Sequence, residues 1–317
     1  MVYSKDWWKK LLALKEFVQQ NNLVNATLLT ICADGNILCD EYDLEAPSCL
    51  FILLSEEKKS LFQNKNTCAL FVSPNLKVVE ICNNGQIAID TILFIKLYLP
   101  FSLLNYFSVQ AKKVYSIAHL TQSVDGRIAT VSGQSKWIGN KEDLLHAHCM
   151  RSLCDAVIVG NNTLRLDEPK LTVRNVEGKN PIKVIIGNSK NSIESLLEKN
   201  TNSIFAFSNQ SLYSSEILVK EFVFEGDRVH SNDILRTLYQ QGIHSVYIEG
   251  GANTISCFLK EKSIDILQVH IANKILGSGK ISFCLDEIQT LDESVTLHNT
   301  CHYKLGNEIL IVSTLTA

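Results

Sequence analysis

Short apolar runs alternate with helical patterns from about Lys113 to the end of the chain, and this alternation limits the possible folds more than any other feature. The runs VYSIAHL, DAVIVG, PIKVIIG, SIFAFS, HSVYIEG and IDILQVHIA have the length and composition of buried strands. Helical patterns such as LLHAHCMRSL and ILRTLYQQ lie between them, which is typical of parallel strands connected by helices. Near the end, HYKL and EILIV flank Gly306-Asn307 and predict an antiparallel hairpin. We therefore predict an α/β domain over residues 111–317, with a mostly parallel sheet, flanking helices and a terminal hairpin.

Residues 1–110 have a different pattern, which predicts a small α+β domain. An amphipathic helix opens it, and short alternating runs come next, with turn signals at Asp34-Gly35 and Asn83-Asn84-Gly85 that predict two hairpins. The stretch YLPFSLLNYFSVQAK is the expected linker to the second domain, and its apolar content indicates that it packs against the protein. This region contains no recognisable active-site constellation, so its role stays open.

Composition favours a protein that acts on small molecules. The 317 residues include 30 Lys and Arg against 33 Asp and Glu, and the net charge of −3 offers no broad positive surface for nucleic acid. The apolar segment 87–109 contains Asp90, Lys96 and Pro100, so we expect no membrane span. Charged residues also interrupt the first helix, which lacks the apolar core of a signal peptide, and we predict a cytoplasmic location.

Neither disulfides nor a metal site are expected. The ten cysteines are scattered and none forms a C-x-x-C pair, which favours reduced thiols. The densest set of potential metal ligands is His146, His148 and Cys149. On a helix these positions point in different directions and cannot close on one ion, so we expect these residues on the helix surface.

The polar loop SVDGRIATVSGQSKW comes directly after the first strand of the α/β domain, where ligands bind in such sheets. Asp125-Gly126 predicts a tight turn, and Asn140 is placed to cap the next helix. An ordinary turn does not explain Ser135 and Trp137, so we expect a ligand near them. On that helix Arg151 lies on the inward stripe, which predicts either an anionic ligand or a buried ion pair with an acidic residue.

Two further strand ends carry polar segments. The loop NNTLRLDEPKLTVR contains Asp167 and Arg174, which suit a binding site but equally a solvated loop. The segment VYIEGGA places Gly250 and Gly251 between a strand and a helix, where backbone amides can bind a phosphate.

Taken together and in order, SVDGRIATVSGQSKWI, MRSLCDAVIVGNNTLRLDEPKLTVR, PIKVIIGNS, VYIEGGA and IANKILGSG resemble the reductase domain of bacterial riboflavin-biosynthesis deaminase/reductases. The resemblance covers residues 113 to about 285 and implies a dihydrofolate-reductase-like fold that is usually dimeric. It also implies a reductase that uses NADPH and transfers hydride to C1′ of a ribosylaminopyrimidine 5′-phosphate, without a metal.

The resemblance assigns roles to individual residues. His119 and Glu249 are the expected catalytic residues. The positions implied for the substrate are Ser135, Arg151, Leu171, Arg174 and Glu249. The positions implied for the cofactor are Thr121, Trp137, Thr163, Asp167, Asn188, Gly250, Gly251 and Ala252.

Three departures from the family leave alternatives open. Many members carry lysine where this chain has His119 and serine where it has Asn188, and a packed strand histidine is the alternative for His119. Residues 1–118 contain no histidine, whereas a zinc deaminase needs a His-x-Glu and a Pro-Cys-x-x-Cys, so we expect no deaminase activity. Reduction of another heterocycle such as a pterin, or nucleotide binding without catalysis, are the competing functions.

Overall fold

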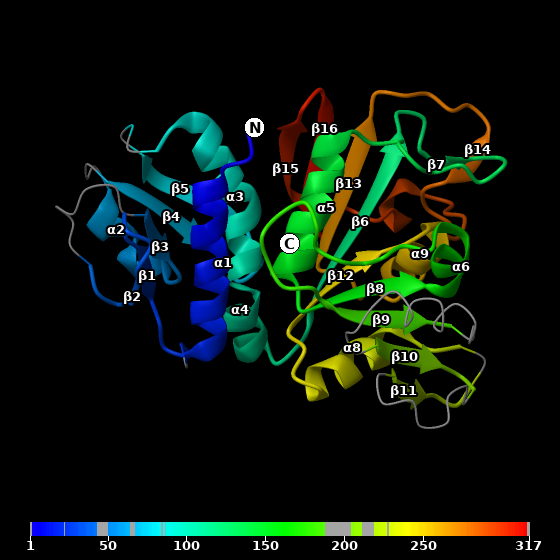
Figure 1. Ribbon diagram of the computed structural model, residues 1–317, viewed down its shortest axis with the longest axis horizontal. Helices are drawn as coiled ribbons and strands as arrows, with labels where there is room; N and C mark the ends of the chain where they lie inside the picture. Colours follow the sequence, from blue (N-terminus) through cyan, green and yellow to red (C-terminus); the bar gives the residue numbers. More distant parts are fainter. Residues whose placement is uncertain are drawn as a thin grey trace. The chain divides into compact units, whose positions relative to one another are not determined.

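Two units make up the chain, Met1–Lys112 and Lys113–Ala317, and each is described by itself (Figure 1). The computed structural model describes residues 2–21, 23–42, 50–63, 67–83, 85, 87–187, 204–210, 219–226 and 228–315. Asn188, a predicted cofactor residue, lies outside the described residues.

The first unit packs three helices with a five-stranded sheet in the order β2-β1-β3-β4-β5. Only β3 and β4 pair in parallel, and the other neighbouring strands are antiparallel. The strands are β1 (Leu28–Ile31), β2 (Ile37–Cys39), β3 (Leu50–Leu53), β4 (Cys68–Val72) and β5 (Val78–Asn83). The helices are α1 (Lys5–Gln20), α3 (Ile89–Ser102) and α4 (Leu104–Ala111), with a short turn of helix at η1 (Glu56–Lys58) and α2 (Lys59–Phe62).

One of the two hairpins predicted for this unit is confirmed and the other is wrong. β1 and β2 pair across Asp34-Gly35, where Gly35 has φ 93°. After β5 the chain enters α3 instead of a returning strand. The side chain of Asn83 exchanges two hydrogen bonds with the backbone of Ile87, at 3.1 and 3.2 Å, and these bonds turn the chain into the helix.

The expected linker, YLPFSLLNYFSVQAK, is helical and forms the end of α3 and all of α4, directly before the second unit. Nine of the 14 residues of α3 are buried, including Phe94 and Tyr98, whose rings contact Trp8 of α1. The 23 residues Ile89–Ala111 are long and apolar enough to cross a membrane by length and composition, yet 72% of their most apolar window is buried inside the protein. Such burial is typical of a core helix.

The second unit contains a nine-stranded sheet in the order β11-β10-β9-β8-β12-β6-β13-β16-β15. All pairs from β11 to β13 are parallel, and β16 and β15 add an antiparallel hairpin. The predicted fold class, a mostly parallel α/β sheet with a terminal hairpin, is therefore confirmed. Its strands are β6 (Tyr115–Ser123), β8 (Ala156–Gly160), β9 (Ile182–Ile186), β10 (Ile204–Ser208), β11 (Val219–Val223), β12 (Ser245–Glu249), β13 (Ile266–Ala272), β15 (His298–Leu305) and β16 (Glu308–Thr314).

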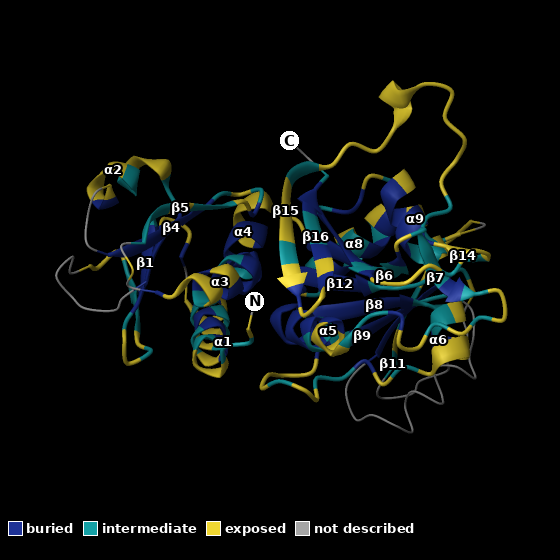
Figure 2. Cartoon of the chain, turned by 90° about the horizontal axis from the view of Figure 1, so that it is seen from above, coloured by how far each residue is buried: buried dark blue, intermediate teal, exposed yellow. Residues whose placement is uncertain are grey.

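Helices cover both faces of this sheet, and most of its strands are buried (Figure 2). The described helices are α5 (Lys141–Leu153), α6 (Asn161–Asp167), α8 (Ser231–Gln240) and α9 (Ala252–Lys260), with a 3-10 turn η2 (Leu291–Glu293). A separate two-stranded sheet pairs β7 (Arg127–Thr130) with β14 (Gly279–Ile281).

The two faces of the large sheet differ in polarity. Alternate residues of the central strands pack with α8 and α9 into an apolar core that includes Leu120, Ile248 and Phe258. The residues between them face α5 and include polar side chains such as Gln268 of β13, which bonds to His146 of α5 at 2.9 Å. Side-chain alternation along each strand therefore separates the core from a polar layer that reaches the carboxyl edge of the sheet.

Candidate active site

The carboxyl ends of β6, β8 and β12 lie side by side, because these strands are parallel neighbours in register. His119 of β6 is paired in register with Glu249 of β12, so the two predicted catalytic residues are neighbours across the strands. The polar segments predicted as loops leave this same edge, but the loop prediction is wrong in part, because Arg127–Thr130 forms β7 and Asn161–Asp167 forms α6. The order of the strands thus brings together His119 and Glu249, which are 130 positions apart in the sequence. The helix α6, which ends at Asp167, begins directly after β8 at the same edge.

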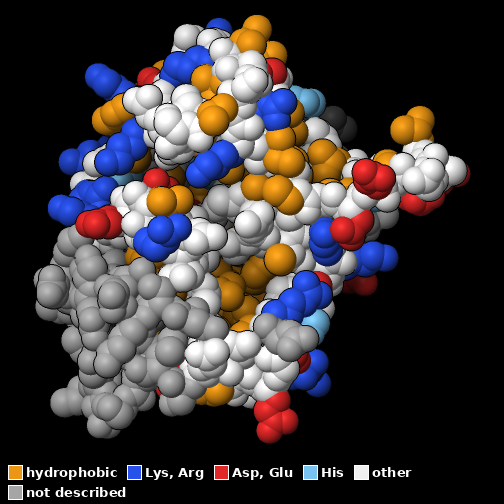
Figure 3. Space-filling view, turned by 90° about the vertical axis from the view of Figure 1, so that its right-hand side faces the viewer, with side chains coloured by type: hydrophobic (Ala, Val, Ile, Leu, Met, Phe, Trp, Pro, Cys, Tyr) orange, Lys and Arg blue, Asp and Glu red, His pale blue; other side chains and the backbone are white. Residues whose placement is uncertain are grey.

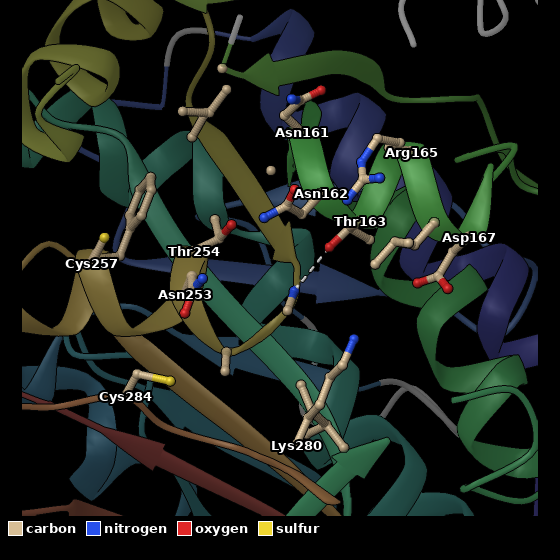
Figure 4. Close-up of a pocket in the computed structure, with 18 of the residues that line it drawn as sticks. Asn161, Asn162, Thr163, Arg165, Asp167, Asn253, Thr254, Cys257, Lys280 and Cys284 are labelled. Carbon is tan, nitrogen blue, oxygen red and sulfur yellow. Dashed lines mark hydrogen bonds between the residues drawn. The ribbon is translucent and has the colours of Figure 1, made fainter. Parts of the chain in front are cut away.

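A cavity of about 940 Å³ opens at this edge. Figure 3 shows the hollow, in which hydrophobic side chains lie among Lys and Arg side chains. Five of the predicted site residues line it, namely Ser135, Thr163, Asp167, Gly251 and Ala252. Sequence reasoning missed other lining residues, among them Asn161, Asn162, Arg165, Asn253 and Lys280, which are labelled in Figure 4.

The turn at Gly250 and Gly251, before α9, packs closely against neighbouring side chains. The backbone N–H of Gly251 donates to Oγ1 of Thr163 at 3.1 Å, which ties the start of α9 to α6 (Figure 4). A Cβ at Gly160 would lie 2.3 Å from Oγ1 of Thr254, and one at Gly250 would lie 3.1 Å from its Cβ. A Cβ at Gly160 would therefore force the Thr254 hydroxyl to move, so the strand end and the first turn of α9 pack closely here.

Arg151 is engaged by Glu249 in a buried ion pair. Its Nε and one terminal nitrogen donate to the two carboxylate oxygens at 2.5 and 2.6 Å, and the other terminal nitrogen donates to the Thr172 carbonyl at 3.2 Å. Burial lowers the pKa of Arg151, but the Glu249 carboxylate outweighs burial and raises that pKa. Of the two alternatives that the helix pattern allowed, the ion pair is the one formed, and it uses Nε and one terminal nitrogen of Arg151.

Arg174 is the more accessible guanidinium. Its side chain is exposed, and one terminal nitrogen donates to Oγ1 of Thr172 at 2.6 Å. Burial and the charge of Arg151 lower the pKa of Arg174. Leu171, three residues before it, is buried with φ 52°, in the left-handed region. These residues lie outside the 940 Å³ cavity.

His119 and Thr121 both contact Asp143, the first-turn acid of α5. Nε2 of His119 lies 3.3 Å from Oδ1 of Asp143, and the Thr121 hydroxyl donates to Oδ2 at 2.7 Å. His270 of β13 lies 3.3 Å from the same Oδ1, and its other ring nitrogen lies 2.7 Å from Glu308. Burial raises the pKa of Asp143, but the two histidines and Thr121 outweigh it and lower the pKa to about 2.

The sequence did not indicate the parts that His270 and Glu308 play in this cluster. Asn140 does cap α5 as predicted, since its side chain accepts from the Asp143 N–H at 2.8 Å. The predicted cap could have identified Asp143 as an acid in the first turn of α5. The contacts of Asp143 with His119 and His270 could not be predicted, because the two histidines lie on strands that only the fold brings near.

Trp137 lies apart from the cavity. Its side chain is 74% exposed, its φ is 68°, and Lys274 donates to its carbonyl at 2.5 Å. Ser135, two residues earlier, does line the cavity and bonds to Asp167 at 3.4 Å. The structure therefore brings Ser135 to the cavity, which Arg151, Arg174 and Glu249 do not line.

Among the residues that the structure describes, no group of three or more His, Cys, Asp or Glu side chains could hold a metal ion. The predicted surface location of His146, His148 and Cys149 is wrong, because all three are completely buried. His146 bonds to the Gln268 side chain, and His148 bonds to the Arg174 backbone.

Comparisons with known proteins agree on the second unit. A family model for the RibD C-terminal domain matches residues 114–311. The chain is 31% identical over 210 residues to the riboflavin biosynthesis protein RibD of Aquifex aeolicus, covering 64% of this chain and 58% of that protein. It is 28% identical over 212 residues to a 2,5-diamino-6-ribosylamino-4(3H)-pyrimidinone 5′-phosphate reductase of Methanothermobacter thermautotrophicus, covering 63% of this chain and 98% of that protein.

The chain thus spans little more than half of the Aquifex RibD protein. Among solved structures, it resembles RibD of Acinetobacter baumannii with a TM-score of 0.63 and 17% identity, over 98% of both chains. At this identity the likeness concerns the fold, and its extent includes residues of both units.

Proposed function

The chain belongs to the RibD C-terminal domain family, and from this premise we propose that it is an NADPH-dependent reductase of a ribosylaminopyrimidine 5′-phosphate, transferring hydride to the ribosyl C1′. The family match over residues 114–311 carries the proposal, because it includes every strand of the parallel sheet and each loop at its carboxyl edge. The archaeal relative that it covers almost completely is named for such a reduction.

The cavity residues fit a dinucleotide cofactor. The volume of the cavity, about 940 Å³, is at the upper end of the range for ligand pockets. The cavity lies at the carboxyl edge of the sheet, where α/β folds bind nucleotides. The Gly251 turn, held by Thr163, presents the amino end of α9, which favours the negative charge of a pyrophosphate. Ser135 and Asp167 on the opposite wall would hold the nicotinamide end. When bound, NADPH supplies the hydride.

The substrate phosphate is assigned to Arg174. Its guanidinium is exposed and matches phosphate geometry, whereas Arg151 is buried and three of its five N–H donors bond to Glu249 and Thr172. We assign Arg151 to the orientation of Glu249, whose carboxylate it holds by two parallel bonds beside His119.

The reduction consumes a hydride and a proton, so the site needs a proton donor near the sugar. His119 is paired in register with Glu249 on the neighbouring strand, and its Nε2 lies 3.3 Å from Oδ1 of Asp143. We assign His119 to proton delivery as the ribose ring opens, with the proton passing to the ring oxygen when its bond to C1′ breaks.

Absorbance of NADPH at about 340 nm tests the proposed function, because oxidation removes the signal. Turnover with a ribosylaminopyrimidine phosphate, and none with pterins, is the expected result. Turnover with a pterin alone would favour the competing enzyme, and NADPH binding without turnover of any substrate would favour a non-catalytic nucleotide-binding protein.

For the first unit we propose a role in structure or protein contact. Residues 1–118 contain no histidine, so the His-x-Glu of a zinc deaminase is missing from this part of the sequence. A homodimer and a cytoplasmic location remain predictions, which sedimentation of the pure protein and fractionation of the source cells can check.

A further inference from the structure

Three successive residues before and at Arg174 are each held by a side chain from elsewhere in the second unit. The Thr172 carbonyl accepts from Arg151 at 3.2 Å, and the Val173 N–H donates to Oδ1 of Asn180 at 2.7 Å. The Arg174 N–H donates to Nδ1 of His148 at 3.0 Å. A loop in which each of three successive residues has a backbone group bonded to a side chain outside the loop has little freedom to change direction.

The start of the same loop needs this support. Leu171 is 1% exposed and has φ 52°, in a left-handed conformation that costs a branched side chain energy. Such a conformation persists only where the surrounding contacts impose it. The three outside bonds just after Leu171 are contacts of that kind.

His148 must be neutral to accept the Arg174 N–H, since a doubly protonated ring has no acceptor. Its side chain is completely buried. Burial, together with the positive charges of Arg151 and Arg174, lowers the pKa of His148 to about 4. The ring therefore accepts this bond throughout the neutral pH range.

One helix supplies two of the three bonds. His148 and Arg151 are three residues apart on α5, so their side chains leave the same side of the helix. Arg151 also holds Glu249 of β12. The position of α5 against the sheet thus determines both the orientation of the Glu249 carboxylate and the path of residues 172–174.

We infer that His148 and Asn180 are positioning residues, which aim the Arg174 guanidinium at the phosphate of the substrate by holding two successive backbone N–H groups. The inference rests on the proposed function for the identity of the substrate. It names two residues that act through Arg174 and touch no reacting atom themselves.

Substitution of His148 separates positioning from a simple packing role. His148→Leu fills similar space and removes the acceptor, whereas His148→Asn places a carbonyl oxygen near the former Nδ1 and serves as the matched control. Loss of one neutral hydrogen bond predicts a roughly threefold to tenfold rise in KM for the phosphorylated substrate in the leucine variant, with kcat unchanged. The asparagine variant should return KM to near the value of the unaltered protein, and the NADPH Kd should be the same in all three.

Binding of ribose 5-phosphate and of ribose, measured by calorimetry without turnover, tests the positioning independently of the reaction. The leucine variant should lose roughly threefold to tenfold in affinity for ribose 5-phosphate and nothing for ribose. Asn180 is exposed, so Asn180→Ala should fold and show the same phosphate-dependent loss even where His148→Leu does not fold.

Equal ribose 5-phosphate affinity in the unaltered protein, His148→Leu and Asn180→Ala would overturn the inference, as would equal losses for ribose and ribose 5-phosphate. If the phosphate-dependent losses occur while no pyrimidine is reduced, the positioning role stands and the proposed reaction fails.

Discussion

Replacing Arg151 with methionine should destabilise the second unit, because it removes the guanidinium and leaves the Glu249 carboxylate without its partner. Methionine keeps most of the apolar stem, so the change is mainly one of charge. The Arg151 side chain is 9% exposed and that of Glu249 is 17% exposed, so the stranded carboxylate recovers only part of its hydration.

The loss of unfolding free energy follows from how deeply the two charges are buried. Breaking a buried ion pair on one side costs about 3–5 kcal/mol. Glu249 retains some contact with solvent, and we therefore expect the lower end, about 3 kcal/mol of unfolding free energy. The double variant Arg151→Met/Glu249→Leu should recover most of this loss, because both charges are then absent.

Urea unfolding monitored by circular dichroism measures the loss. Arg174→Met is the matched control, since Arg174 is exposed and its removal should change the unfolding free energy little. The reasoning would be refuted by an Arg151→Met protein that unfolds at the same urea concentration as the unaltered protein while its KM for the phosphorylated substrate rises strongly. Arg151 would then bind the phosphate directly.

Three further predictions concern the site and its surroundings. Arg174→Lys keeps the charge but loses the planar fork, so KM for the phosphorylated substrate should rise roughly tenfold or more while NADPH affinity stays constant; steady-state kinetics and calorimetry check this, and an unchanged KM contradicts it. Gly251→Asp should weaken NADPH binding because the carboxylate repels the pyrophosphate, and the matched variant Gly251→Ala should lose much less; equal Kd values for all three proteins would remove the turn from the cofactor site. Burial, and then the charge of His119, lower the pKa of His146 from 6.5 to about 3, so the unfolded chain takes up this proton first and stability is lost as the pH falls from about 6.5 toward 3. The slope should be about 1.4 kcal/mol per pH unit from this residue, and His146→Asn should reduce it in thermal melts across that range.

The fold of the second unit could be predicted from local patterns, because each buried strand needs an apolar run and each connecting helix needs an apolar stripe. The terminal hairpin and the cap at Asn140 were likewise predictable from a few adjacent residues. The pattern failed at Asn83, where a turn signal read as a hairpin leads into α3. Turn residues indicate a change of direction, but the element after the turn depends on whether a neighbouring strand is available to pair with the chain.

The sequence alone determined which runs form buried strands and which segments at their ends are polar, since composition is a property of one segment at a time. It was wrong for His146 and His148 of α5, which are completely buried. It placed Arg151 on the buried side of α5 and left its partner open. Only the tertiary structure decided that both carboxylate oxygens of Glu249, 98 positions away, accept hydrogen bonds from Arg151, and that Arg174 stays exposed. It likewise joined Asp143 to His119 and His270 and turned Trp137 to the surface. These outcomes depend on strand order and register, which set the distances between charges from separate segments, and an ion pair forms only where those distances fall within a few ångströms.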